Sequence, residues 1–143
     1  HRDLHSFPTR RSSDLFPEPA RIHALQGTQM IFYPTAIGWT PEMQKFEQFS
    51  NTRWEAAMRA HASMNGIFIA AANRVGKEEE IRFWGGSFIA DPYGEIIAKG
   101  SSNKEEIVIG EINTENIYKS QDGWGFLRNR RPDTYHNLTR DHH

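Results

Sequence analysis

The side chains best placed for chemistry follow a short apolar run. Pro34, Thr35, Ala36 and Ile37 come directly after residues 30–33, which have the continuous apolar pattern of a strand buried on both faces. Proteins of the α/β class commonly bind ligands beyond the carboxyl ends of such strands, so these four residues are candidates for lining a substrate pocket. The alternative is a turn in which the threonine hydroxyl bonds to its own backbone. Neither interpretation gives them a catalytic role.

Four further polar residues are placed where they can support a site. Asn73 and Arg74 end a second predicted buried strand, where an asparagine can satisfy turn amides and an arginine can reach a carboxylate. Glu18 and Arg21 lie three residues apart on a predicted helix and could pair, or Glu18 could favour the positive end of that helix. For all four residues a structural role is favoured over contact with substrate.

Other residue types that carry chemistry are absent or isolated. The chain has no cysteine, which excludes disulfides, thiolate metal ligands and a cysteine nucleophile. His61 has no second histidine or carboxylate at metal-ligand spacing, so we predict a packed or interface histidine and no metal site. Arg128, Arg130 and Arg131 cluster, but no nucleic-acid-binding motif accompanies them. Packing of this tail against protein is the simpler interpretation.

The composition is that of a globular domain without a strong electrostatic field. A chain of 143 residues with 37% hydrophobic residues can bury one core, and its formal net charge of -1 offers nothing to attract nucleic acid or an anionic membrane. No apolar run approaches the roughly 20 residues that span a bilayer. We therefore expect a soluble, cytoplasmic protein with no nucleic-acid or membrane partner.

Apolar periodicity predicts helices that alternate with buried strands, in an α/β layered fold. Helices are expected at residues 17–26, 53–65 and 114–120, the last capped by Asn113. Strands are expected at residues 30–33, 68–76, 88–89, 96–99 and 107–112. Residues 35–50 are predicted to be a loop and residues 123–143 an extended tail. One side of the helix at 53–65 carries Trp54, Met58, His61 and Met64, either as ordinary core or as a surface facing another subunit.

Five segments occur in the order found in one enzyme family. They are LQGTQMIFYPTAIG, TRWEAAMRAHASMNG, AANRVG, GGSFIADPYGEI and WGFLRNRRPDTY. Together they resemble the C-terminal half of the carbon-nitrogen hydrolase (nitrilase) superfamily, over Phe16 to about Leu138. The resemblance implies half of an α-β-β-α four-layer sandwich, a Glu-Lys-Cys triad, and no metal or organic cofactor. It also implies homo-oligomers built across the helical faces.

The position of the family's nucleophile is altered in this sequence. The family carries its cysteine in a segment of the form Cys-Trp-Asp-Gln-Trp-Phe-Pro-Glu, of which only Phe16, Pro17 and Glu18 match here. The cysteine position falls on Arg11, whose guanidinium stays protonated and cannot attack a carbonyl. The family's Glu and Lys belong to an N-terminal half that nothing in this sequence resembles. We therefore expect the chain as written to be inactive.

The resemblance implies a definite reaction for the complete enzyme. A cysteine thiolate attacks the carbamoyl carbon of N-carbamoylputrescine, with Glu as general base and Lys stabilising the oxyanion, and water resolves the acyl-enzyme. The products are putrescine, CO2 and ammonia. Two alternatives stay open: another amide- or nitrile-hydrolysing branch of the superfamily, and a non-catalytic scaffold protein that pairs with full-length subunits.

The opening residues differ from the rest of the chain. Residues 1–15 show no sustained periodicity, and residues 2–15 fit one translated frame of a widely used short-read sequencing adapter. Our hypothesis is that an assembly error joined adapter to a partial gene. The alternative is a natural arm whose Arg10 and Arg11 contact a phosphate or an acidic partner. The expected organisation is a leader at 1–15, a partial hydrolase domain at 16–112, and a helix with a tail at 113–143.

Overall fold

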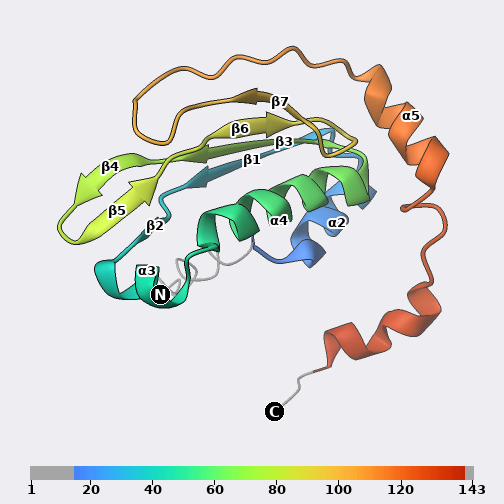
Figure 1. Cartoon of the computed structure of the whole chain (residues 1–143). Helices are drawn as coiled ribbons and strands as arrows, with labels where there is room; N and C mark the ends of the chain where they lie inside the picture. The colour runs from blue at the N-terminus through green and yellow to red at the C-terminus, as the bar shows by residue number, and fades with distance from the viewer. Residues whose placement is uncertain (1–14, 141–143) are drawn as a thin grey trace, which may run out of the picture.

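Two small β-sheets and a layer of helices make up the computed structural model, which describes residues 15–140 (Figure 1). The helices are α2 (Pro17–Leu25), α3 (Pro41–Phe46), α4 (Ser50–Asn65), α5 (Glu115–Trp124) and the 3-10 helix η1 (Pro132–Thr139). The strands are β1 (Met30–Thr35), β2 (Gly38–Trp39), β3 (Phe68–Asn73), β4 (Val75–Glu78), β5 (Ile81–Trp84), β6 (Phe88–Ala90) and β7 (Ile96–Lys99). The predicted α/β class is confirmed. Of the predicted leader, only Leu15 is among the described residues; the rest of it, including Arg11, lies outside them.

The larger sheet has the strand order β1-β3-β6-β7 and lies against α4 and α2 (Figure 1). β1 and β3 are parallel, so the chain between them must cross over, and α4 forms that crossover. The β6 and β7 strands continue the sheet in antiparallel fashion. Because β1 and β3 run the same way, their carboxyl ends at Thr35 and Asn73 meet as register partners at one end of the sheet.

The strand β1 is longer and less buried than predicted. We expected residues 30–33 to be buried on both faces, but Phe32 is 68% exposed while Ile31 and Tyr33 pack against the core. The strand also continues through Pro34, which we expected to end it. A proline is tolerated here because β1 is an outermost strand of the described sheet and needs no N–H on its open side.

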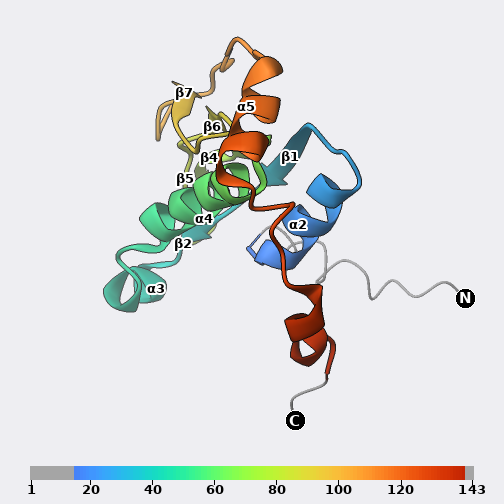
Figure 2. The same cartoon turned by 90° about the vertical axis from the view of Figure 1, so that its right-hand side faces the viewer.

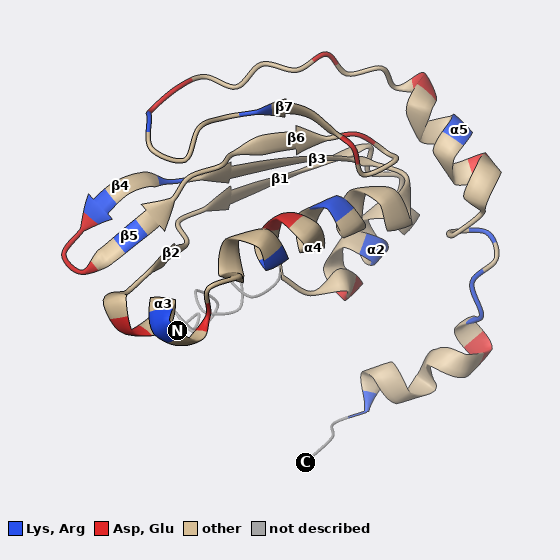
Figure 3. Cartoon of the chain, in the orientation of Figure 1, with Lys and Arg blue, Asp and Glu red and all other residues tan. Residues whose placement is uncertain are grey.

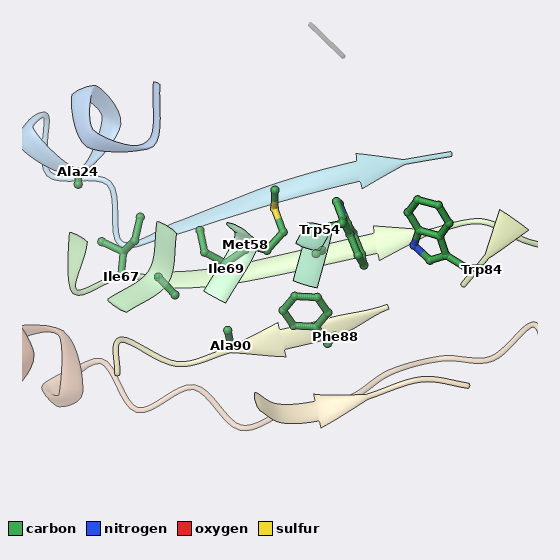
Figure 4. Close-up of a cluster of buried hydrophobic side chains, with 10 residues drawn as sticks. Ala24, Trp54, Met58, Ile67, Ile69, Trp84, Phe88 and Ala90 are labelled. Carbon is green, nitrogen blue, oxygen red and sulfur yellow. The ribbon is translucent and has the colours of Figure 1, made fainter. Parts of the chain in front are cut away.

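The helix α4 supplies most of the core that covers the sheet (Figure 4). Its buried side chains recur at helical spacing and are Trp54, Met58, His61, Ala62 and Asn65. They pack on Ile69 and Phe88 of the sheet, with the Trp54 and Phe88 rings edge-to-face at 5.5 Å. The predicted helix is confirmed, but Met64 is 45% exposed, because the buried face of the helix runs through the neighbouring Ala62 and Asn65.

Two regions contain structure that the sequence pattern did not reveal. Residues 35–50 were expected to be a loop, but they form β2 and α3, and the Thr40 hydroxyl caps α3 by accepting the Met43 N–H at 3.2 Å. A threonine followed by Pro41 is the usual start signal of such a helix. The hairpin of β4 and β5 was also missed; it pairs with β2 to form the second sheet, and its tip carries several charges (Figure 3).

The strands predicted at residues 88–89 and 96–99 are confirmed as the β6–β7 hairpin, whereas the strand predicted at residues 107–112 is wrong. Asp91 holds the hairpin turn by accepting the Tyr93 and Glu95 N–H groups on one carboxylate oxygen. Beyond β7 the chain runs in a long arc without a strand (Figure 1). Its Ile107 and Ile109 are 87% and 84% exposed. The apolar alternation is present, but no described strand pairs with it.

The helix α5 docks on the body of the fold, and the residues just after it stay in contact with α2 and the core. Asn113 accepts the Glu115 N–H at 3.0 Å, as predicted for its cap, and Ser120 donates to the Pro92 carbonyl at 2.9 Å. The helix runs on to Trp124, further than expected. The predicted extended tail instead contains η1, which lies apart from both sheets (Figure 2). In the described part of the chain no helix is long and apolar enough to cross a membrane.

Two glycine substitutions are expected to have opposite effects. Gly66 ends α4 at φ 62°, and an added Cβ would lie 2.6 Å from Cγ of Gln121, so Gly66→Ala should lower the free energy of unfolding by more than about 1 kcal/mol. Gly123 lies within α5 with nothing near its Cβ position, so Gly123→Ala should raise it by about 0.5 kcal/mol. Urea denaturation followed by circular dichroism measures both free energies of unfolding. Equal changes for the two variants would contradict the left-handed, crowded position described for Gly66.

Candidate functional site

The carboxyl ends of β1 and β3 are joined through one buried asparagine. Asn73, 8% exposed, accepts the Ile37 N–H on Oδ1 at 2.9 Å. Its Nδ2 donates to the Ile37 carbonyl at 3.1 Å and to the Gly85 carbonyl at 3.1 Å. The amide oxygen of Asn73 and both hydrogens of its amide nitrogen therefore have hydrogen-bond partners. Through these bonds, two separate loops are tied to the end of β3. We call this arrangement the Asn73 clamp.

A second set of bonds secures the backbone around the Asn73 clamp. The Ser87 hydroxyl accepts the Asn73 N–H at 2.9 Å and donates to the Asn73 carbonyl at 3.2 Å. The Arg74 N–H donates to the Thr35 carbonyl at 3.1 Å, and the Gly85 N–H donates to the Arg74 carbonyl at 3.0 Å. Gly85 and Gly86 have φ of 56° and 67°, a backbone that suits glycine at the crowded turn. The loop after β1 is thus held at several points.

Within that loop the predicted pocket residues have different environments. The Thr35 hydroxyl donates to the Tyr33 carbonyl at 3.1 Å, which is the local backbone bond that the sequence left open as the alternative. Ile37 lines a cavity of about 460 Å³, together with the first turns of α4; Pro34, Thr35 and Ala36 do not line it. The cavity also reaches Leu15, four positions after Arg11. A substrate-lining role stays a prediction for the four residues, and Ile37 is the one that faces this space.

The described lining of the cavity combines two charged side chains with apolar rings, and it contains no thiol. Glu47 and Arg53 line it with opposite charges, and the Glu47 carboxylate accepts the Ser50 hydroxyl at 2.8 Å. Trp54 and Trp84 form its apolar wall. The chain has no cysteine, and among residues 15–140 no cluster of three His, Asp or Glu side chains could hold a metal ion. This wall can exclude water and orient a small ligand.

The remaining support candidates act away from the cavity. Arg21 does not pair with Glu18; its Nη1 donates to the Phe126 carbonyl at 3.3 Å, which ties α2 to the chain after α5. Burial, and then the charge of Arg130, lower the pKa of Arg21. The Arg74 guanidinium pairs with Glu78 and lies 4.5 Å over the Phe83 ring, so it braces the β4–β5 hairpin. Glu18 lies in the first turn of α2.

The proposed interface residues of α4 are mostly core residues in this chain. Trp54, Met58 and His61 are 4%, 0% and 4% exposed, and the His61 ring lies 6.1 Å from that of Tyr33. These three residues therefore lie in the ordinary core, which was the alternative that the sequence left open. Met64 alone of the four presents a large exposed surface.

Three residues of this site were missed from the sequence. Trp84 is the last residue of β5, and Ser87 lies between β5 and β6. Trp39 packs its ring 4.8 Å from that of Trp84. The signal for them was the Gly-Gly pair at 85–86, which marks a turn that other groups approach closely.

Comparison with known proteins places the chain in a family. Residues 13–121 match the family described as carbon-nitrogen hydrolase. An N-carbamoylputrescine amidase of Solanum tuberosum is 41% identical over 128 residues, which cover 84% of this chain and 42% of that protein. A citrullinase of Francisella tularensis is 33% identical over 129 residues, covering 87% and 44%. The chain thus spans less than half the length of these relatives.

Solved structures agree with the sequence matches. The crystal structure of a carbon-nitrogen hydrolase from Helicobacter pylori G27 superposes with a TM-score of 0.84 at 38% identity, covering 90% of this chain and 47% of that one. A mutant of an amidase from Nesterenkonia sp. AN1, with the acetamide moiety of fluoroacetamide covalently added at the active-site cysteine, gives a TM-score of 0.63 at 26% identity, covering 87% of this chain and 40% of that one. The nitrilase-like fold expected from the sequence is confirmed.

Proposed function

The chain belongs to the carbon-nitrogen hydrolase family, and we propose that it forms the pocket wall of an amidase that hydrolyses N-carbamoylputrescine to putrescine, CO2 and ammonia. One observation carries the choice of substrate. Four plant N-carbamoylputrescine amidases match at 39% to 41% identity, above the 33% of the citrullinase.

The proposed reaction needs groups that this chain does not carry. A cysteine thiolate attacks the ureido carbon, and ammonia leaves after taking up a proton. Water then hydrolyses the acyl-enzyme to a carbamate, which loses CO2 to give putrescine. The Nesterenkonia amidase, with its covalent adduct at an active-site cysteine, supports this chemistry for the family. The chain has no cysteine, and the family's position for it is occupied by Arg11. We therefore propose that the chain as written is catalytically silent.

The residues that are present would bind and orient the substrate. The Asn73 clamp fixes Ile37, which lines the larger cavity, and a pocket wall that is rigid before binding loses little entropy on binding. Trp54 and Trp84 keep the inner wall apolar, which strengthens polar contacts made inside it.

The test of the proposed function is a chimera. Residues 16–143 are joined to the N-terminal part of the potato amidase, which ends just before the position equivalent to Phe16. We expect the chimera to release ammonia and putrescine from N-carbamoylputrescine and to act more slowly on citrulline, while the 143-residue chain releases neither product. The matched control is the same chimera with its nucleophilic cysteine replaced by alanine. A folded chimera that is silent, or that prefers citrulline, would contradict the proposal.

A further inference from the structure

The larger sheet has a second face, on the side away from α4, and this outer face is apolar. Successive side chains of a strand point to opposite faces, and Ile69 and Ala71 of β3 pack in the core beneath α4. The residues between and beside them, with their register partners on the neighbouring strands, therefore point the other way. These outer-face residues are Phe32, Pro34, Ala70, Ala72, Ile89 and Ala98.

The strands of the larger sheet place no charge on the outer face. The only charged residue within β1, β3, β6 and β7 is Lys99, and it pairs with Glu55 of α4, on the opposite face. In Figure 3 the charges gather instead on the β4–β5 hairpin, on the helices and on the chain after β7. A sheet face that meets water normally carries polar side chains. The outer face has the composition of one that packs on another layer.

The described chain covers only part of the outer face. The segment after β7 crosses it beside β6, where a Cβ added at Gly110 would lie 3.1 Å from Cδ1 of Ile89 (Figure 1). Toward β1 the face is open, and Phe32 is 68% exposed. Ile107 and Ile109 of the crossing segment are exposed as well. Together these side chains form an apolar patch of the kind that marks a protein interface.

A second copy of the chain suits this patch in layer order and in charge. The four-layer sandwich reads α-β-β-α, and the described chain supplies one helical layer and one large sheet. A copy related by a two-fold axis supplies the same two layers in the reverse order, so the pair restores the full sequence of layers. A two-fold interface brings identical surfaces together, and strands without charges meet there without repulsion.

We propose that two copies of this chain pack outer face on outer face, across a two-fold axis, as a sheet-on-sheet sandwich. Sheets packed in this way lie about 10 Å apart. This interface lies on the side of the sheet opposite to the helical faces that the sequence suggested for oligomers. From strand spacing and rise, the four strands present roughly 300 Å² in plan. A standard interface buries about 800 Å² per partner, so the dimer forms reversibly with concentration.

Sedimentation velocity of the 143-residue chain tests for this dimer. The mass should rise from that of one chain at about 1 µM to that of two at about 200 µM, the range expected for a small interface. Phe32→Lys puts a charge on the outer face and should weaken self-association at least about tenfold. The matched control is Phe46→Lys, the same change at an 86% exposed side chain of α3, and it should leave self-association unchanged.

Crosslinking locates the interface without depending on the lysine variant. The chain has no cysteine, so an introduced cysteine is its only thiol. Ala72→Cys, exposed on the outer face, should give a covalent dimer with a bismaleimide that spans about 15 Å, which is comparable with the width of the four strands. Ala60→Cys, exposed on α4, is the same change on the other side of the sheet and should stay monomeric.

Several results would overturn the proposed dimer. They are a chain that is monomeric at about 200 µM, a dimer that Phe32→Lys does not weaken, or crosslinking of Ala60→Cys as efficient as that of Ala72→Cys. A chain that is monomeric alone and pairs only with the N-terminal part of the potato amidase would also overturn it, in favour of that occupant. None of these measurements involves catalysis, so the chimera assay decides the proposed function separately.

Discussion

Asn73→Ala is expected to lower the free energy of unfolding by about 2–4 kcal/mol, because three partly buried backbone groups lose their partner at once. The Ile37 N–H, the Ile37 carbonyl and the Gly85 carbonyl would be left without the amide that now satisfies them. The loss should be larger than for most surface substitutions. The alanine methyl group makes no hydrogen bond, and water does not reach all three backbone groups to replace the lost amide. Urea denaturation at neutral pH measures it.

Two further variants show whether the loss comes from the Asn73 clamp. Asn73→Asp keeps the oxygen that accepts the Ile37 N–H, but it turns a carboxylate oxygen toward two carbonyls, so it should be at least as destabilising as alanine. Asn103→Ala, at an exposed loop position, should stay within about 0.5 kcal/mol of the unaltered chain. If Asn73→Ala were as mild as Asn103→Ala, the Asn73 clamp would not hold the loop.

Met58→Ala is expected to cost about 2–5 kcal/mol, as a methionine removed from a filled core leaves a cavity. Met58 is 0% exposed and lies in the cluster between α4 and the sheet (Figure 4). Met64→Ala is a matched control, with the same chemical change on the same helix at a side chain that is 45% exposed, and it should cost less than about 1 kcal/mol. Thermal unfolding of the two variants measures the difference. Similar costs would mean that α4 does not face the sheet as described.

The predictable part of the fold consists of elements whose signals are local. The helix α4 carries an apolar stripe and ends at Gly66, which has a left-handed backbone conformation. The residues of the turn between β6 and β7 indicate that hairpin. The segment at 107–112 has the apolar alternation of a strand, but no described strand lies beside it to form hydrogen bonds. Apolar alternation alone does not supply a neighbouring strand. Likewise, the exposure of Phe32 depends on which layers cover β1.

The predictable part of the site consists of residues at strand ends. The loop after β1 and Asn73 were found because ligand-binding and turn-forming groups gather at the carboxyl ends of parallel strands. The remaining members come from far along the chain: Gly85 and Ser87 reach Asn73 only through the β4–β5 hairpin. Such contacts are tertiary, so no spacing in the sequence predicts them. The same holds for the pairing of the Trp39 and Trp84 rings.

A ligand-bound structure would show whether this chain supplies the wall of an amidase pocket. We would crystallise the chimera, with its nucleophilic cysteine replaced by alanine, in the presence of N-carbamoylputrescine. We expect the ligand in the cavity between Ile37 and α4, with atoms within about 4 Å of Ile37 and of Trp84. A ligand bound at full occupancy elsewhere, with this cavity closed or filled only by water, would contradict it.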